Sequence, residues 1–439
     1  MEAEEPKEPT ELEVDAPKCT KQKMKGSVEF LLQDTTLNVM MSASNNTFMS
    51  LAEGGMHHLL AGARANVGIS KGRYMFEVKV IEFTAVADSY SKGQKHTLKV
   101  GFATSASSLF LGDTAESICF ESLGSVLHNK TRTKACPPFA VNKHSVLGVL
   151  LNLEPGPNAN TISLFVDGVR ASQPHALPDA LKGKALHPCI NYKNITAHVN
   201  FGPETICPLP FKCRMLQDAA QADIVVAKAD APADGKYEVV FPVGLPDEGT
   251  FDRLDQFLKK NPKHMEISER MIMDWVEKSG VPKSRTARTS NDKPEKGFGV
   301  KELDDDSIRR AVLAVAPMQG RHYVVMEIKR NLIEDDRKAL LAQWPEAMFK
   351  RIADVAVGSP PPEYKAQVQK AVLEAKQQKA ERAWELKKLE KLRQKKIAKQ
   401  KKEAEKARQK ALKLAKKKQE EAKKKMEEAK KKAEEAKKK

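Results

Sequence analysis

Apolar and polar side chains alternate along several short stretches in the first half of the chain. Residues 74–80 (YMFEVKV) place a large apolar group at every second position, and residues 97–102 and 161–166 repeat the pattern. A two-residue period predicts strands with one buried face. Residues 146–151 (VLGVLL) carry no polar side chain and predict a central strand covered on both faces. Such short strands, separated by Gly and Asn, predict an antiparallel β-sandwich.

The pattern changes in the second half, where apolar residues also recur with helical spacing. Strands are predicted at residues 237–241 and 322–328, a turn at 242–246, and helices at 252–260, 271–278 and 335–352. Phe251, Leu254 and Leu258, for example, share one face of the first helix. Alternating strands and helices predict a small parallel α/β domain.

These patterns divide the chain into five segments. We predict a disordered acidic N-terminus at residues 1–26, a β-sandwich at 27–213, a linker at 214–235, an α/β domain at 236–363 and a helical tail at 364–439. The first segment carries too few apolar groups to offset the entropy cost of ordering. The predicted fold class is multidomain α+β, followed by a long charged helix.

The charge of the chain is concentrated in its tail. The 439 residues carry a net charge of +17. Residues 365–439 hold 30 basic and 12 acidic side chains, whereas residues 1–364 hold 45 and 46. The folded part is therefore neutral, and any strong attraction for polyanions belongs to the last 75 residues.

Several protein classes do not fit the sequence. The longest nearly continuous apolar run, residues 146–153, is far shorter than the ~20 residues that a membrane helix needs. The acidic N-terminal sequence does not resemble a secretory signal. The six cysteines form no CxxC pair and lie at no zinc-finger spacing, and His57 and His58 have no Cys or Asp cluster nearby. We expect a soluble, non-secreted protein with reduced thiols, no bound metal and no membrane contact.

Four motifs in the predicted sandwich resemble the SPRY domain. Residues 68–78 (GISKGRYMFEV) are similar to its Gly-x-x-x-Gly turn and YFEV strand, and residues 99–103 (KVGFA) to its RVGW strand with Phe102 in place of Trp. Residues 162–168 (ISLFVDG) and 198–202 (HVNFG) resemble its later hairpin and its closing strand. The resemblance implies a bent two-sheet sandwich that is not an enzyme. It further implies that loops at one edge, here around residues 85–96 and 122–136, bind a partner protein.

Further matches resemble the heterogeneous nuclear ribonucleoprotein U family. Residues 60–69 (LAGARANVGI) are similar to its WAGGRASYGV, residues 238–246 (EVVFPVGLP) to its EVVMMIGLP, and residues 364–370 (YKAQVQK) to its DYKQRTQ. In that family the SPRY domain precedes a polynucleotide-kinase-like, phosphate-binding domain. The resemblance implies that residues 236–363 derive from such a domain.

The phosphate loop itself is altered. A working loop needs G-x-x-x-x-G-K-[ST], in which Lys neutralises phosphate charge and Ser or Thr holds magnesium. Gly244 and Gly249 keep the glycine spacing, but Thr250 and Phe251 replace the Lys and the hydroxyl residue. Of the family's later acidic motif, Glu327 alone is retained. We predict a vestigial site with no cofactor and no catalytic residue. An active polynucleotide kinase is the less favoured alternative.

The sequence of the tail predicts a helix and leaves open both its assembly and its role. It contains neither Gly nor Pro, and near its end EEAKKKM-type heptads repeat. A solitary charged helix and a weakly self-associating coiled coil both fit this pattern. The lysine-dense part favours non-specific contact with RNA or DNA phosphates, through candidate residues Lys395, Lys396, Lys399, Lys401, Lys402 and Arg408. A helical spacer is the alternative.

The sequence therefore favours a nuclear, ribonucleoprotein-like scaffold. Its SPRY-type domain would bind a protein, and its tail would bind RNA or DNA. Since no Arg-Gly-Gly repeat occurs, nucleic-acid binding rests on the tail lysines alone. A cytoplasmic structural or interaction protein, with the tail as a spacer or coiled coil, is the alternative hypothesis.

Overall fold

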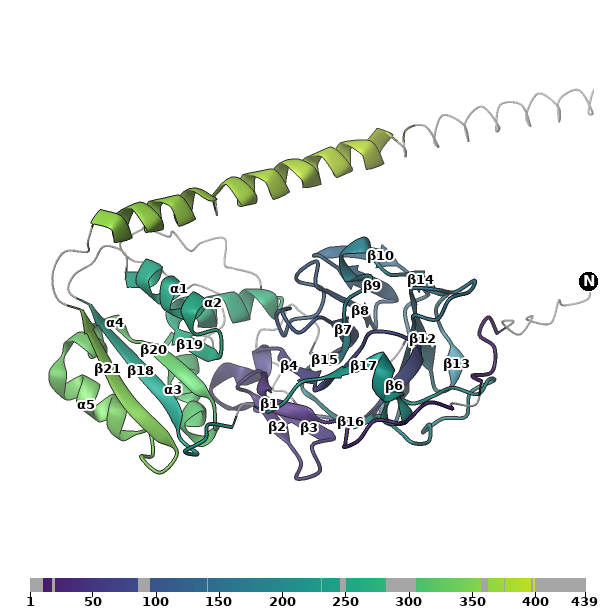
Figure 1. Cartoon of the computed structure of the whole chain (residues 1–439), viewed down its shortest axis with the longest axis horizontal. Helices are drawn as coiled ribbons and strands as arrows, with labels where there is room; N and C mark the ends of the chain where they lie inside the picture. The colour runs from purple at the N-terminus through teal and green to yellow at the C-terminus, as the bar shows by residue number, and fades with distance from the viewer. Residues whose placement is uncertain are drawn as a thin grey trace, which may run out of the picture. The chain divides into compact units, whose positions relative to one another are not determined.

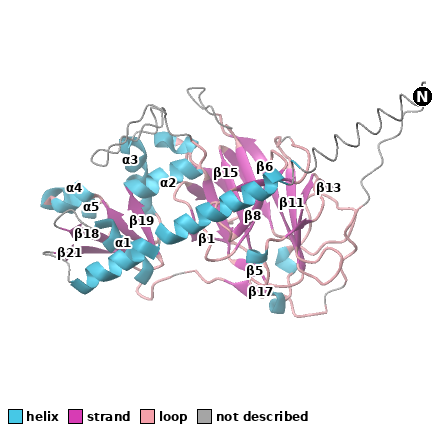
Figure 2. Cartoon of the chain, turned by 90° about the horizontal axis from the view of Figure 1, so that it is seen from above, coloured by secondary structure: helices cyan, strands magenta, loops and turns pink. Residues whose placement is uncertain are grey.

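The structure is a computed structural model of the 439-residue chain. It describes residues 11–17, 20–85, 95–139, 141–229, 231–244, 250–281, 305–356, 362–374, 376–395 and 398. The chain divides into two compact units, Met1–Val357 and Gly358–Lys439. Two antiparallel sheets and an α/β region lie in the first unit, and a long helix lies in the second (Figures 1 and 2).

The first antiparallel sheet has the strand order β1-β4-β15-β7-β8-β9-β10. Its strands are β1 (Phe30–Thr35), β4 (Ala61–Ala65), β7 (Thr97–Ala103), β8 (Ser117–Glu121), β9 (Ser125–His128), β10 (Thr131–Lys134) and β15 (His187–Lys193). Gly101 in β7 lies so close to β8 that a Cβ atom there would be 2.1 Å from the carbonyl oxygen of Ile118. The close pairing of β7 and β8 therefore requires glycine at this position.

The second antiparallel sheet has the order β13-β12-β11-β6-β16-β3-β2, and β14 also pairs with β12. Its strands are β2 (Val39–Met41), β3 (Thr47–Ser50), β6 (Arg73–Phe83), β11 (Val146–Asn152), β12 (Thr161–Val166), β13 (Val169–Arg170), β14 (His175–Ala176) and β16 (Ile195–Asn200). The two sheets share one apolar core, in which Phe76 of β6 meets Phe102 of β7 edge-on at 5.4 Å. The antiparallel sandwich expected from the alternating pattern is confirmed.

Strand β11 is covered on both faces, as its continuous apolar sequence predicted. It pairs with β6 on one side and with β12 on the other. Leu147, Val149 and Leu151 point into the core between the sheets. Leu150 points to the opposite face, where it joins a smaller cluster with Phe211 and Met215. The segment after the last sandwich strand therefore covers the outer face of this sheet.

The α/β region contains a parallel sheet of order β19-β20-β18-β21. Its elements are β18 (Tyr237–Gly244), α1 (Thr250–Lys260), β19 (His264–Ser268), α2 (Glu269–Lys278), α3 (Asp305–Val315), β20 (His322–Met326), α4 (Ile328–Leu332), α5 (Glu334–Ala342) and β21 (Phe349–Ala356). Leu254 of α1 packs on one face of the sheet, against Val240 and Val324. The other face packs against α2, α3 and α5. Among the described residues, no helix is long and apolar enough to cross a membrane.

Two predicted elements in this region were wrong. Residues 242–246 were predicted to form a turn, yet β18 continues to Gly244 in register with β21. Pro242 has no N–H to donate, and this is tolerated because β18 pairs with β20 only up to Val240, two residues earlier. The Pro242 carbonyl accepts a hydrogen bond from Asn331 Nδ2 at 2.9 Å. Residues 335–352 were predicted to form one helix. Instead α5 ends at Ala342, shortly before Pro345, and Phe349 begins β21.

The N-terminal segment is not wholly disordered, contrary to the prediction for residues 1–26. The side chain of Glu13 is only 2% exposed and pairs with Arg73. Residues 11–17 run along the outside of the second sheet, and Lys23 forms a bridge to Ala220. We call residues 11–17 the N-terminal strap. Its order comes from ion pairs with the sandwich rather than from its own apolar content.

The predicted linker at residues 214–235 is also a packed segment for much of its length. Met215, Leu216, Ala219 and Ala220 are each at most 1% exposed. Two short 3-10 turns, η3 (Leu216–Asp218) and η4 (Gln221–Asp223), lead into β17 (Ile224–Val226), which pairs with β5 (Val67–Ile69). Small alanine side chains permit this close packing, so an Ala-rich composition did not mark a free linker.

The sandwich and the α/β region share a second apolar cluster within the first unit. Leu37, Met56 and Leu59 of the sandwich pack with Trp275, Val276 and Val312 of helices α2 and α3. Met56 belongs to the 3-10 segment η1 (Glu53–His58). Two further short 3-10 helices among the described residues are η2 (Asp179–Leu181) and η6 (Ala316–Met318). The two regions are therefore joined by a buried interface as well as by the chain.

The second unit contains a helix over residues 362–374 and 376–395. Its larger apolar side chains are exposed, from 55% for Leu386 to 66% for Leu373, and Trp384 is 62% exposed. The ammonium group of Lys388 lies 4.9 Å from the Trp384 ring centroid. Helix formation is confirmed for these residues, and the heptads after residue 398 lie outside the described residues.

Candidate functional site

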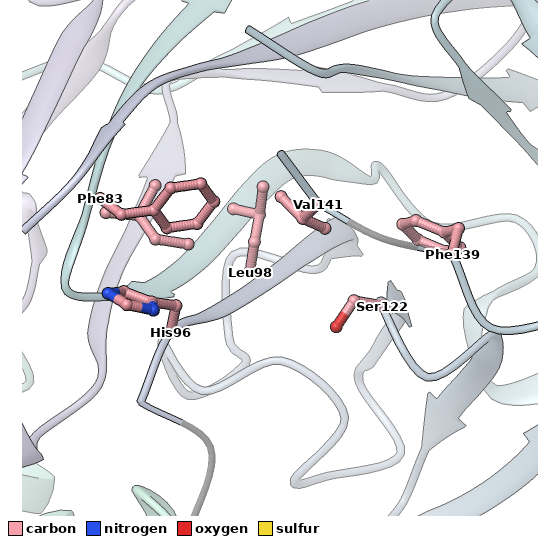
Figure 3. Close-up of a pocket in the computed structure, with 7 residues that line it drawn as sticks. Phe83, His96, Leu98, Ser122, Phe139 and Val141 are labelled. Atoms are coloured by element: carbon pink, nitrogen blue, oxygen red, sulfur yellow. The ribbon is translucent and has the colours of Figure 1, made fainter. Parts of the chain in front are cut away.

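A pocket of about 420 Å³ lies at one edge of the sandwich (Figure 3). It is lined by Phe83, His96, Leu98, Ser122, Phe139, Val141 and Ile195. These residues come from the end of β6, the start of β7, the segment after β8, residues 139–141 and the start of β16. The volume falls within the range of small-ligand and side-chain pockets.

The pocket walls are mainly apolar, with two polar groups among them. His96 lies beside Phe83, the two rings meeting edge-on at 4.8 Å, and its Nε2 is 3.1 Å from the Thr84 carbonyl. The backbone N–H of Phe139 donates to the Ser122 carbonyl at 3.1 Å, which ties residue 139 to the end of β8. Such a pocket suits an apolar side chain whose backbone can hydrogen-bond at the rim.

Both loops that the SPRY resemblance singled out contribute to this pocket. His96 ends the first loop and Ser122 begins the second. Residues 86–94 of the first loop lie outside the described residues. The sequence did not identify Phe83, Leu98, Phe139, Val141 or Ile195 as site residues. They resemble ordinary core positions in the pattern, and only the fold brings these separate segments together.

The predicted vestigial phosphate site maps to the carboxyl end of the parallel sheet. Gly244 ends β18, Thr250 and Phe251 begin α1, and Gly249 lies outside the described residues. Glu327 directly follows β20, the neighbour of β18. The chain runs from β18 to β19 at one edge of the sheet and from β20 to β21 at the other edge, so the two adjacent strands connect in opposite directions. Such a position is called a topological switch point, and ligands of open α/β sheets bind just outside it.

The chemistry at this switch point does not favour phosphate or magnesium binding. Glu327 is 5% exposed, and its Oε2 accepts a hydrogen bond from Arg309 Nη1 at 3.2 Å. The same guanidinium lies 3.5 Å from Glu269 Oε1. A carboxylate already neutralised by a neighbouring arginine is a poor ligand for a divalent cation. The sequence analysis did not identify Arg309 as a site residue; it belongs to helix α3.

Three potential metal ligands lie together at the opposite, amino end of the sheet. Glu238, His264 and His322 lie in the first two residues of three adjacent strands, and their ligand atoms lie within 4.8 Å of one another. However, His322 Nδ1 accepts the backbone N–H of Glu238 at 3.0 Å. A neutral imidazole that accepts at Nδ1 carries its proton on Nε2, so neither nitrogen offers a metal a lone pair. The side chains as placed therefore do not fit a metal site.

The buried thiols do not provide nucleophiles. The five cysteines among the described residues are free. Burial raises the pKa of Cys119, Cys189 and Cys213 to about 12, so these thiols are protonated at neutral pH. A thiol in that state is unreactive.

Of the predicted nucleic-acid-binding residues, Lys395 is the one that the structure describes, and it is exposed on the tail helix. Lys396, Lys399, Lys401, Lys402 and Arg408 lie outside the described residues. Residues 376–395 are exposed and carry eight Lys or Arg side chains and three Glu side chains, and most of the candidate residues follow them. The proposed basic surface therefore stays a prediction.

Comparison with known proteins finds distant relatives. No family model matches the chain. The chain is 24% identical over 238 residues to heterogeneous nuclear ribonucleoprotein U-like protein 2 of Homo sapiens, a match covering 52% of this chain and 31% of the relative. The Mus musculus protein of the same name is 25% identical over 208 residues, covering 47% and 27%. The match thus spans less than a third of these relatives.

Solved structures similar to part of this chain include two SPRY domains. The SPRY domain of human HERC1 matches with a TM-score of 0.31 at 14% identity, covering 40% of this chain and 99% of that structure. A further human SPRY domain matches with a TM-score of 0.29 at 14% identity, covering 39% and 99%. TM-scores of this size do not by themselves assign a fold.

Proposed function

We propose that this chain is a protein-binding scaffold of the heterogeneous nuclear ribonucleoprotein U-like kind. The sandwich would be a SPRY domain that holds a partner protein, and the tail would hold RNA or DNA. The observation that carries the proposal is the apolar pocket at Phe83, Leu98 and Val141, which adjoins the two loops that the SPRY motifs mark for partner binding. The distant relatives named as ribonucleoprotein U-like support the same reading.

We further propose that the α/β region is not an enzyme. Its loop lacks the Lys and the hydroxyl group of a phosphate loop, and Glu327 is paired with Arg309. The region would then serve as a structural partner of the sandwich. A nuclear location follows from the ribonucleoprotein reading, and a cytoplasmic scaffold with a spacer or coiled-coil tail is the alternative. The exposed Trp384 and Leu389 support weak self-association in that second case.

Placing a charge in the pocket should weaken partner binding at least tenfold. We expect peptides selected from a random library against the full chain to lose at least tenfold in affinity, about 1.4 kcal/mol, for the Val141→Asp variant, because the carboxylate has to be desolvated by an apolar side chain. Val169 lies on β13 and is 60% exposed, so Val169→Asp is the matched control and should retain binding. Equal binding of the selected peptides by Val141→Asp would place the partner site elsewhere.

Removing the tail should remove nucleic-acid binding and its salt dependence. We expect the full chain, but not a chain ending at Tyr364, to bind a 30-nucleotide RNA or a DNA duplex with an affinity that falls steeply with salt. Neutralising the six candidate residues from Lys395 to Arg408 with Gln should lower the logarithmic salt slope for single strands by up to about 4. Arg at the five lysines keeps the charge and should leave the slope unchanged. An unchanged slope in the truncated chain would favour the spacer reading.

A further inference from the structure

The N-terminal strap occupies a groove that the sandwich builds around two buried arginines. Arg73 begins β6 and Arg170 ends β13, and their side chains are 3% and 4% exposed. Asn152, at the end of β11, and Asn158, in the loop before β12, line the same groove. All four side chains come from the sandwich, so the groove does not depend on the strap for any of its donors.

The groove holds two carboxylates at alternate positions of an extended peptide. Glu11 accepts hydrogen bonds from Arg170 Nε at 3.0 and 3.1 Å. Glu13 accepts from Arg73 Nη1 at 2.8 Å and from Asn152 Nδ2 and Asn158 Nδ2 at 3.2 Å each. Charge-assisted bonds of this kind are the strong ones in proteins, and they require an ionised acidic residue at both positions.

Two further hydrogen bonds from the groove side chains are accepted by backbone carbonyls of the strap, so they do not depend on its side chains. Asn158 Nδ2 donates to the Leu12 carbonyl at 3.0 Å, and Arg73 Nη2 donates to the Val14 carbonyl at 2.6 Å. The side chains of Leu12 and Val14 point away, with residue exposures of 42% and 74%. Any extended peptide with a Glu-x-Glu spacing therefore offers the groove the same partners.

The arginines are held in place from behind by groups other than the strap. The guanidinium of Arg170 stacks 4.8 Å from the Phe165 ring centroid, and that of Arg73 lies 5.9 Å from the Phe211 ring centroid. Glu154 Oε2 lies 3.8 Å from Arg73 Nε. With the strap in place both guanidiniums are nearly excluded from water, and Glu154 balances only part of the charge of Arg73. An acidic peptide that replaces the strap therefore restores the charge-assisted bonds that release of the strap would break.

We propose that this groove is a docking site for an acidic Glu-x-Glu segment of a partner protein, which the chain's own N-terminal strap occupies in the free state. Tethering gives the strap an effective concentration of roughly millimolar, so a free peptide competes poorly with it. A partner segment binds when the strap is weakened or when the partner is already bound elsewhere on the chain. This surface is separate from the pocket at Leu98 and Val141, and the inference does not depend on that pocket.

The test uses the full chain and a fluorescent peptide of residues 11–17, ELEVDAP. We expect the Glu11→Gln variant to bind this peptide at least tenfold more tightly than the wild-type chain, because its own strap has lost one of its two anchors. Asp15 accepts from the Lys212 backbone and touches neither arginine, so Asp15→Asn is the matched control and should bind as the wild type does. Adding Arg170→Ala to Glu11→Gln should abolish binding, as should replacing both peptide glutamates by Gln.

Three results would overturn the proposal. The first is no saturable binding of the peptide by folded Glu11→Gln protein up to about 1 mM, the concentration scale of the tether. The second is equal binding of the Gln-substituted peptide. The third is displacement of the peptide by a 12-nucleotide DNA as readily as by unlabelled peptide, which would assign the groove to nucleic acid. Thermal melting confirms that each variant is folded, and Glu11→Asp replaces Glu11→Gln if the latter melts below the assay temperature.

Discussion

Replacing Glu13 with alanine is expected to destabilise the folded chain by about 3–5 kcal/mol. The substitution removes the partner of Arg73, whose side chain is 3% exposed and donates to Glu13 Oε2 at 2.8 Å. It also leaves Asn152 and Asn158 without their carboxylate acceptor. Glu154 Oε2, 3.8 Å from Arg73 Nε and 30% exposed, balances only part of the charge that remains, so the loss is far larger than the value of an exposed ion pair.

The measurement is urea unfolding of the full chain, compared with two controls. Asp15→Ala removes a strap carboxylate that caps the exposed Lys212 backbone, and we expect a loss of at most about 1 kcal/mol. Replacing both partners, as Glu13→Leu with Arg73→Met, should recover most of the loss, because no unpaired charge then remains. A loss below about 1 kcal/mol for Glu13→Ala would mean that the strap leaves its groove readily and that Arg73 is solvated from outside.

The strands of the sandwich were predictable because their side chains follow the period that burial imposes. Residues 74–80 alternate since one face of β6 meets Phe102 across the core. The VLGVLL sequence of β11 has no exposed face at all, and its two neighbours and two apolar clusters explain why. Local pattern and tertiary burial agree at β11. At β6 the prediction of one exposed face was wrong, because Met75 and Glu77 on that face are each 1% exposed and Met75 packs in one cluster with Phe211.

The strap and the packed part of the linker could not be predicted in the same way. Glu11 and Glu13 lie in a stretch rich in Glu and Pro, and their order depends on arginines 60 to 160 positions away in the chain. The alanines at 219 and 220 carry no periodic signal, yet both are fully buried. Composition describes what a segment can bury by itself, and it does not describe what the rest of the fold provides.

The error in the predicted helix at residues 335–352 could have been avoided from the sequence itself. Pro345 stood in the sequence as a helix breaker, and the structure places Trp344 in the bend after α5 and Phe349 at the start of β21. The pocket had no comparable signal. Phe83, Leu98 and Ile195 each satisfy a strand pattern, and only the closure of the sandwich brings them together at its edge.

The interface between the sandwich and the α/β region combines apolar packing with directed hydrogen bonds. Trp275 Nε1 donates to the Leu60 carbonyl at 2.8 Å, and the Leu60 N–H donates to Ser279 Oγ at 2.8 Å. Arg321 donates to both oxygens of Thr35, with Nη2 to Oγ1 at 2.8 Å. Lys278 lies 3.3 Å from Asp113 and 5.3 Å from the Phe110 ring centroid. An interface of this kind makes two regions unfold together rather than separately.

Substituting Trp275 with alanine should therefore both destabilise the chain and divide its unfolding into two steps. Trp275 is 3% exposed and packs in one cluster with Met56 and Leu59 of the sandwich. Truncating a buried tryptophan costs about 3–5 kcal/mol through lost burial and the cavity left behind. The Leu60 carbonyl also loses its donor. Because the lost contacts bridge the two regions, the coupling between them weakens along with the stability of α2.

Differential scanning calorimetry distinguishes these effects. We expect the wild-type chain to give one main transition for residues 11–356 and the Trp275→Ala chain to give two, the lower one belonging to the α/β region. Trp384→Ala, in the tail helix where the side chain is 62% exposed, is the matched control and should leave the transition unchanged. Two well-separated transitions in the wild type would contradict the proposed coupling. A single lowered transition in Trp275→Ala would mean that the remaining bonds from Arg321 and Lys278 are enough to keep the two regions cooperative.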